Sequence, residues 1–268
     1  KEEKEEYSKF WKNFGEVMKE GLCEGALEEK ESLLEVCRFY SNKLENIEFI
    51  GLDDYIERMA EGQSQIFFLT GDNIDALRKH PHLEGFNKRE IEVLLLADHV
   101  DDFWVNVVNQ YKNYEFTSVS SSSYDLDSIK KLNKEEEKSE SSNDNEKDVL
   151  DYIKNIVGTK VKDIRPSTKL VESPACLSVP EGGMSIRMER YLIDQKQLKN
   201  ASAKILEINM KHPIISKISA DLKNNAANDD TSDLAQIVYD QACVIEGEPL
   251  SDVASFTAKM NKFIARAV

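Results

Sequence analysis

A polar segment in the middle of the chain divides its 268 residues into two parts. Residues 119–148 read VSSSSYDLDSIKKLNKEEEKSESSNDNEKD, with few apolar side chains and many serines, glutamates and lysines. Such a segment cannot bury enough apolar surface to offset the entropy lost on ordering, so it predicts a charged linker. The chain is therefore expected to have a folded region over 1–118, the linker, and a second folded region over 149–268.

The first region predicts helices followed by a small parallel sheet. Three short apolar runs read as strands, at Ile66–Thr70, Glu92–Ala97 and Glu115–Val119, and helical patterns separate them. The runs are continuous rather than alternating, which is typical of strands buried on both faces. We therefore expect a small α/β/α sandwich.

The second region predicts an α+β unit that ends in two helices. A helix over 149–157 precedes strands near 161–164, 175–179 and 204–209, and a further helix begins at Ile214 after the segment 210–213. Two long helical patterns then close the chain.

The closing helices are separated by only a few residues, which predicts an antiparallel pair. Thr231 or Ser232 is expected to cap the first helix, Gly247 to stop it, and Ser251 to cap the second. Two such helices have spare apolar faces, which are covered either by the domain beneath them or by a second copy of the chain. A four-helix bundle, with two helices from each of two copies, is the expected arrangement. The expected interface residues are Leu234, Ile237, Val238, Ala242, Ile245, Phe256, Met260 and Ile264.

The net charge of the chain limits the classes of molecule that it is expected to bind. Its 50 acidic and 35 basic residues give a net charge of −15, which disfavours binding to nucleic acid and to anionic membranes. No run of about 18 apolar residues is present to span a bilayer. The four cysteines are scattered, with no C-x-x-C pair, which favours reduced thiols in a cytoplasmic protein.

The sequence gives only weak indications of a catalytic site. Neither a G-x-G-x-x-G nor a phosphate-binding P-loop occurs, and no catalytic or metal-binding residue is predicted. His80-Pro81-His82 reads as a loop too short to form a convergent site. Asp98, His99 and Asp101 follow a predicted parallel strand, where α/β active sites form, so a small α/β enzyme stays open as an alternative. However, Asp101 also suits the first turn of a helix, where carboxylates stabilise free N–H groups.

Two apolar groups point instead to an interaction surface. Met184, Met188, Tyr191 and Leu192 share one face of a predicted helix, which suits either a core stripe or an adaptable binding patch. The adjacent Phe103 and Trp104 point about 100° apart on a helix, so at least one ring is expected to be partly exposed.

Six sequence blocks occur in a fixed order. They are EGQSQIFFLTGD (61–72), IEVLLLADHVDDFW (91–104), VKDIRPSTKLVESPA (161–175), MSIRMERYL (184–192), LEINMKHPI (206–214) and DLAQIVYDQA (233–242). In this order they resemble the heat-shock protein 90 chaperone family, in its bacterial form. The resemblance covers essentially the whole chain outside the linker.

The resemblance implies a part of an ATP-driven chaperone. Family members have an ATP-binding domain, a middle domain and a dimerisation domain, and this chain resembles the end of the second and the whole third. It begins inside a helical pattern without a methionine, so it is expected to be a piece of a longer protein. ATP and Mg²⁺ would then serve the parent, and this piece is expected to be neither an enzyme nor a cofactor binder.

The resemblance also assigns roles to residues. Non-native client proteins are expected to contact Phe103 and Asn106, with Trp104 as the alternative ring. The second expected contact is the set of Met184, Met188, Tyr191 and Leu192. The expected function is a homodimer that holds non-native proteins, and the remaining alternatives are a small enzyme and an inert dimeric scaffold.

Overall fold

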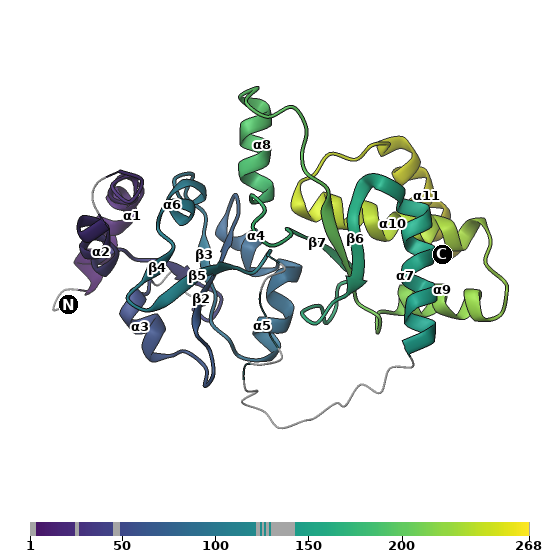
Figure 1. Ribbon diagram of the computed structural model, residues 1–268, viewed down its shortest axis with the longest axis horizontal. Coiled ribbons are helices and arrows are strands. Elements are labelled where there is room, and N and C mark those ends of the chain that lie inside the picture. Colours follow the sequence, from purple (N-terminus) through teal and green to yellow (C-terminus); the bar gives the residue numbers. More distant parts are fainter. Residues whose placement is uncertain are drawn as a thin grey trace.

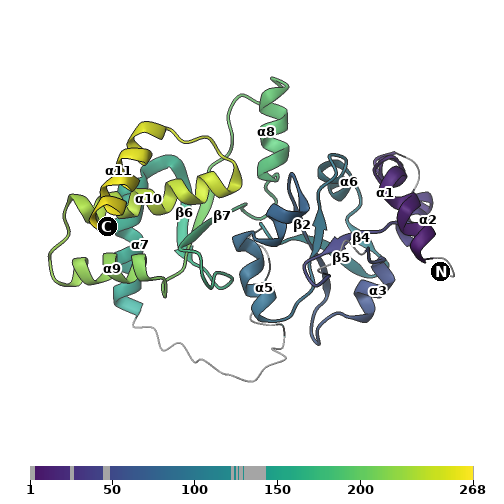
Figure 2. The ribbon, with the colours of Figure 1, turned by 180° about the vertical axis from the view of Figure 1, so that it is seen from behind.

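Two β-sheets, each with its own helices, make up the computed structural model, and helix α8 (Ile186–Asp194) stands between them (Figure 1). The reverse view shows the same arrangement (Figure 2). The structure describes residues 4–24, 27–44, 49–121, 124, 126, 129 and 143–267. No described helix has the length and apolar composition that crossing a membrane requires.

The first sheet has five strands in the order β1-β3-β2-β5-β4. Its central strands β3 (Leu94–Leu96), β2 (Gln65–Thr70) and β5 (Tyr114–Ser118) are parallel, which confirms the sequence prediction. The edge strands β1 (Tyr40–Ser41) and β4 (Gln110–Tyr111) pair antiparallel and were not predicted. The sheet is therefore mixed. The edge strands were not predicted because two residues are too few to show a periodic pattern.

Successive side chains of β2 enter two different cores. Ile66 and Phe68 pack in a cluster with Trp104, whereas Phe67 and Leu69 pack in another with Phe86. Both faces of the sheet are thus buried, as its continuous apolar strands require. The first cluster takes in α1 (Lys4–Glu20), α2 (Leu27–Val36), α3 (Leu52–Glu57) and α6 (Asp101–Val107), and the second α4 (Ile74–Arg78), η1 (Pro81–Leu83) and α5 (Glu84–Lys88).

The second sheet has three strands in the order β6-β8-β7. The strand β8 (Lys204–Ile208) is parallel to β6 (Val161–Pro166) and antiparallel to β7 (Ala175–Ser178). Its core includes Ile153, Leu206 and Val238, among others. The helices of this half are α7 (Asn143–Val157), η3 (Gly158–Lys160), α9 (Pro213–Lys223), α10 (Asp229–Glu246) and α11 (Val253–Ala267).

The described ends of the predicted linker are more ordered than expected. Val119, Leu126 and Ile129 are buried in the core of the first sheet, and α7 already begins at Asn143. The remainder of 119–148 lies outside the described residues. Composition misjudged these ends because a few apolar side chains need only an existing core to pack against.

The closing helices are antiparallel within the chain. Lys262 of α11 lies 2.6 Å from Asp233 of α10, and Arg266 contacts Asp230, so the end of α11 meets the start of α10. Gly247 ends α10 in the left-handed conformation, at φ 68°, as predicted.

The predicted helix starts were slightly wrong. Asn228, not Thr231 or Ser232, caps α10, and its side chain accepts the N–H of Asp230 at 2.9 Å. At α11, Asp252 rather than Ser251 accepts the first free N–H, from Ser255 at 2.8 Å. In both cases an Asx side chain is the cap, three residues before Thr231 at α10 and one residue after Ser251 at α11.

A buried lysine joins α1 to the end of the first sheet. The Nζ atom of Lys19 lies 2.8 Å from Asp98 Oδ2 and 2.9 Å from Asp101 Oδ1. Trp104 Nε1 donates to the same Asp101 oxygen at 2.6 Å. Asp101 is fully buried, so its charge depends on these partners.

We expect Lys19→Gln to destabilise the first half strongly. The substitution leaves Asp101 charged and uncompensated in the core, which costs about 3–5 kcal/mol. Urea unfolding followed by tryptophan fluorescence measures the loss. Lys12→Gln, on the exposed face of the same helix, is the control and should change stability by less than about 0.5 kcal/mol. Equal effects of the two substitutions would contradict the buried-pair interpretation.

Candidate functional site

Helix α8 begins two residues later than predicted. Its N-cap is Ser185, whose hydroxyl accepts the N–H of Met188 at 3.2 Å, and its first residue is Ile186. Met184 therefore precedes the helix, although it remains 40% exposed. Met188 and Leu192 are half-buried, so the methionine-bearing segment is only partly a surface stripe.

Helices α6 and α8 meet through two aromatic rings. The rings of Phe103 and Tyr191 lie 5.3 Å apart at 88°, an edge-to-face contact. The two side chains stay 37% and 46% exposed, and Val107, one turn further along α6, is 48% exposed. We call Phe103, Val107, Met184 and Tyr191 the α6–α8 patch. The structure thus joins two groups that are 77 or more residues apart in the sequence.

Trp104 is the ring that lies inside. It is fully buried, with its ring centroid 5.3 Å from that of Phe116. The alternative that Trp104 contacts a partner is therefore wrong for this fold, and Phe103 is the exposed neighbour. Asn106 is exposed, and its amide donates to the Asp102 carbonyl of its own helix at 2.6 Å.

Arg187 ties α8 to the carboxyl end of the first sheet. Its guanidinium lies 3.1 Å from Asp72 Oδ1, just after β2, and 3.2 Å from Asp102 Oδ2 on α6. Burial raises the pKa of Asp102, and the charge of Arg187 opposes that rise. The ion pair therefore holds α8 against α6 beside the aromatic contact.

Two further charged side chains fix the other faces of α8. Glu189 is buried, contacts Lys204 of β8 and accepts the N–H of Ser202 at 3.2 Å. Arg190 donates to the backbone carbonyl of Glu246, at the end of α10, at 2.6 Å. These anchors were not predicted, because the periodicity of apolar residues carries no information on charged side chains. Three charged residues within a single turn of a helix were the sequence signal that could have indicated them.

A small cavity lies beneath the start of α8. Its volume of about 90 Å³ suits a few water molecules and is too small for an aromatic side chain. Any large apolar ligand must therefore bind on the patch and not beneath it. The lining residues include Thr70, Asp102, Asn106, Ser118, Ser120 and Ser185.

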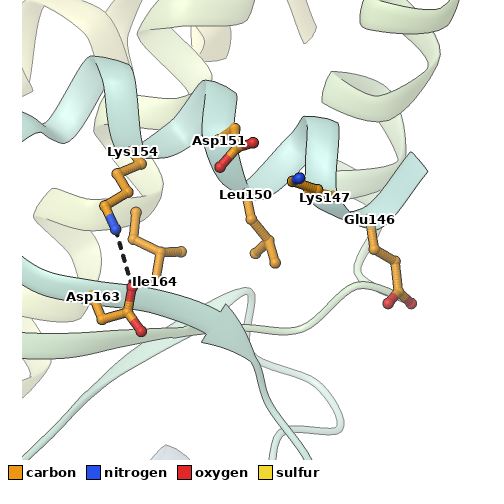
Figure 3. Close-up of a pocket in the computed structure, with 7 residues that line it drawn as sticks. All are labelled: Glu146, Lys147, Leu150, Asp151, Lys154, Asp163 and Ile164. Carbon is orange, nitrogen blue, oxygen red and sulfur yellow. Dashed lines mark hydrogen bonds and ion pairs between the residues drawn. The ribbon is translucent and has the colours of Figure 1, made fainter. Parts of the chain in front are cut away.

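A second hollow lies between α7 and β6 (Figure 3). Its lining has three acidic residues and two lysines, and Lys154 pairs with Asp163 at 3.1 Å. This contact lowers the pKa of Asp163. Half-exposed pairs of this kind are solvated surface charges and do not indicate catalysis.

The predicted dimer residues separate into two groups. Ile237, Val238 and Ala242 are buried within the chain itself, so their proposed place in an interface between copies is wrong for this structure. The helical pattern could not distinguish an internal core from an interface. Leu234, Phe256 and Met260 are half-buried, whereas Ile245 and Ile264 are 41% and 54% exposed. Val244 and Val253, which the sequence analysis omitted, are also exposed at 52% and 62%.

The two carboxylates of the candidate enzyme group, Asp98 and Asp101, are engaged in structural contacts. Asp98 and Asp101 both bind Lys19, and Asp101 also accepts from Trp104. His99 is exposed beside them. A catalytic carboxylate needs a free oxygen in reach of substrate, which the fully buried Asp101 lacks.

The short His80-Pro81-His82 segment does find a convergent partner. Glu246, at the end of α10, brings its carboxylate to both imidazoles, so the expectation that the loop was too short is wrong. The third group comes from more than 160 residues away in sequence, which local spacing cannot reveal.

We expect Arg187→Gln to loosen α8 from α6. Backbone amides of 187–194 should then exchange hydrogen about tenfold faster, which corresponds to about 1.4 kcal/mol of lost local stability. Hydrogen exchange followed by mass spectrometry measures this. Asp102→Asn should have a smaller effect, because Arg187 keeps its contact with Asp72, and the double variant should differ little from Arg187→Gln alone. Lys199→Gln, exposed beyond α8, should leave the exchange unchanged, and fully additive effects would contradict the assignment.

Comparison with known proteins supplies the family. The model of the Hsp90 protein family matches residues 1–268. Chaperone protein HtpG of Rickettsia bellii is 47% identical over 98% of this chain, that of Ehrlichia canis 46% over 97%, and that of Wolbachia pipientis 42% over 99%. The chain spans 42% of the length of each of these relatives. With the match extending over both sheets and the helices between and beyond them, the chain belongs to the Hsp90 family of chaperones.

Proposed function

We propose that this chain is the client-holding and dimerising part of an ATP-driven cytoplasmic chaperone. In this proposal residues 1–118 are the end of a middle domain and residues 149–268 a dimerisation domain. ATP and Mg²⁺ act in the parent protein, outside the surfaces described here. The family membership and the α6–α8 patch are the observations that support it.

The α6–α8 patch carries the proposal for client binding. Its four apolar side chains are 37–48% exposed, and they come from two helices held together by an edge-to-face ring contact. Clustered exposed apolar residues of this kind suit a protein partner with exposed apolar segments. A non-native protein displays such segments, and the unbranched Met184 side chain adapts to varied ones.

Avidity supplies the mechanism. One patch of this size binds an extended chain weakly, but two patches in a dimer can engage the same client. The second contact then occurs at a high effective concentration, which strengthens binding without new chemistry. This mechanism links client holding to dimerisation.

We expect Phe103→Ala to weaken client binding about tenfold, since truncating a central aromatic in an interface costs about 1–2 kcal/mol. Fluorescence anisotropy with a labelled, permanently unfolded model protein measures the affinity. Phe14→Ala removes the same ring from α1, where it is 53% exposed outside the patch, and should change nothing.

The two variants separate the proposal from its alternatives. Equal affinity of both would place the client elsewhere, and no binding by the unmodified chain would favour an inert scaffold. Enzymatic turnover abolished by Asp98→Asn would support the small α/β enzyme instead.

The exposed side chains at the end of the chain support a homodimer. Val244, Ile245, Val253 and Ile264 are 41–62% exposed, and they lie on the adjacent helices α10 and α11. A second copy of the helix pair would cover them and give the four-helix bundle.

We expect Val253→Glu to weaken the dimer at least tenfold, because a buried charge replaces an apolar contact. Sedimentation velocity over a range of concentrations measures the equilibrium. Val17→Glu on α1 is a matched control, since both valines are 62% exposed, and it should leave the dimer intact. A monomeric unmodified chain at micromolar concentration would refute the homodimer.

A further inference from the structure

Three potential metal ligands meet between the two halves of the chain. His80 and His82 flank the start of η1 in the first half, and Glu246 ends α10 in the second. The Oε1 atom of Glu246 lies 3.0 Å from His82 Nε2 and 3.6 Å from His80 Nε2. One ligand atom from each residue lies within 4.8 Å of the other two.

The local backbone aims these side chains at one another. Pro81 begins the 3-10 turn, and the two imidazoles stack with centroids 5.0 Å apart at 19°. On the other side, Gly247 stops α10 directly after Glu246. Arg190 holds the Glu246 carbonyl, so the end of α10 is fixed against α8 as well.

Hydrogen bonding leaves this group unsatisfied. His82 is fully buried, and neither of its ring nitrogens has a hydrogen-bond partner of ordinary geometry, although the nearby Leu177 backbone raises the pKa of the ring and so offsets part of the effect of burial. Glu246 Oε1 is likewise buried without such a partner. Buried polar atoms without partners are rare and call for a bound water or ion.

The two imidazoles are in the protonation state that suits a cation, whereas burial opposes the negative charge of Glu246, a cost that a bound cation would offset. Burial lowers the pKa of His80 to about 4 and holds the pKa of His82 well below its usual range, so both rings are neutral near pH 7. Burial also raises the pKa of Glu246. Neutral imidazoles cannot form an ion pair with this carboxylate, but they are the form of histidine that binds metal ions.

We propose that His80, His82 and Glu246 bind a divalent transition-metal ion of the zinc class. Two imidazole nitrogens and one carboxylate oxygen form a donor set that zinc prefers. Tetrahedral zinc places neighbouring ligand atoms about 3.4 Å apart, from bond lengths of about 2.0–2.1 Å. The two contacts of 3.0 and 3.6 Å bracket that spacing.

Two features of the surroundings bear on affinity. The buried Lys169 opposes a cation, but its charge is offset by Glu207, 3.5 Å away. His80 Nδ1 accepts the N–H of His82 in a long 3.3 Å bond. A metal ion at Nε2 moves the ring proton to Nδ1 and replaces that weak bond with a coordinate bond.

The proposed ion would act as a structural link. It would tie the turn after α4 to the end of α10, and so join the half with the α6–α8 patch to the half with the exposed pair α10 and α11. This role does not depend on client binding or on dimerisation. It revises the sequence-based expectation of no metal site.

Zinc titration of the chelator-treated chain, with a fluorescent zinc indicator as competitor, tests the proposal. We expect one ion per chain, with a dissociation constant on the order of 1 μM or tighter. His80→Ala and Glu246→Gln should each weaken binding by about 100-fold or more. His99→Ala removes an exposed histidine outside the group and should leave the affinity unchanged.

Two further readouts make the test decisive. Zinc should raise the melting temperature of the unmodified chain and of His99→Ala, but not that of His80→Ala. Cobalt should give the visible spectrum of a four-coordinate site in the unmodified chain. The proposal is overturned if the unmodified chain binds no stoichiometric ion, or if His80→Ala and Glu246→Gln bind as tightly as it does.

Discussion

The place of helix α8 between the two sheets depends on its charged side chains. Arg187, Glu189 and Arg190 of α8 reach the first sheet, the second sheet and the end of α10, respectively. Because these polar contacts fix the helix, its apolar residues are not all needed for packing. Tyr191 can therefore remain 46% exposed beside Phe103. Exposure of the α6–α8 patch is thus a consequence of electrostatic anchoring, not of a missing core.

Because polar contacts hold α8 in place, the α6–α8 patch can be apolar without destabilising the fold. If α8 were held by hydrophobic contact alone, a bound apolar segment would compete with the contacts that position the helix. Ion pairs with Asp72, Asp102 and Lys204 do not exchange with an apolar ligand. The client binding proposed for the patch would therefore leave α8 in its place.

The sequence predicted the parts of this fold that follow from local periodicity. The continuous apolar runs located the parallel strands β2, β3 and β5 because burial on both faces leaves no polar positions in them. The edge strands β1 and β4 escaped notice, since two residues carry no period. The six ordered motifs identified the family correctly, although no single motif sufficed.

The candidate sites were less predictable because they depend on which surface meets an apolar residue. The helical pattern of 101–107 could not decide between Phe103 and Trp104, and only the neighbouring Phe39 and Phe116 rings show that Trp104 is the buried one. The same ambiguity placed Val238 in an interface between copies although it fills the core of its own chain. Apolar periodicity identifies a buried face but not the surface that buries it.

The group of His80, His82 and Glu246 could not be predicted for a different reason. His80 and His82 seemed insufficient because their partner, Glu246, lies in the other half of the chain. Convergence of this kind appears only when the two halves are placed against each other, as they are where Glu84 of the first half accepts the N–H groups of Val171 and Glu172. Within the second half, Arg190 bonds to the carbonyl of Glu246 itself. The contact that anchors α8 therefore also sets the position of the carboxylate. A change in the placement of α8 would therefore alter the patch and the His80–His82–Glu246 group together, which makes this helix one physical link between the two sheets.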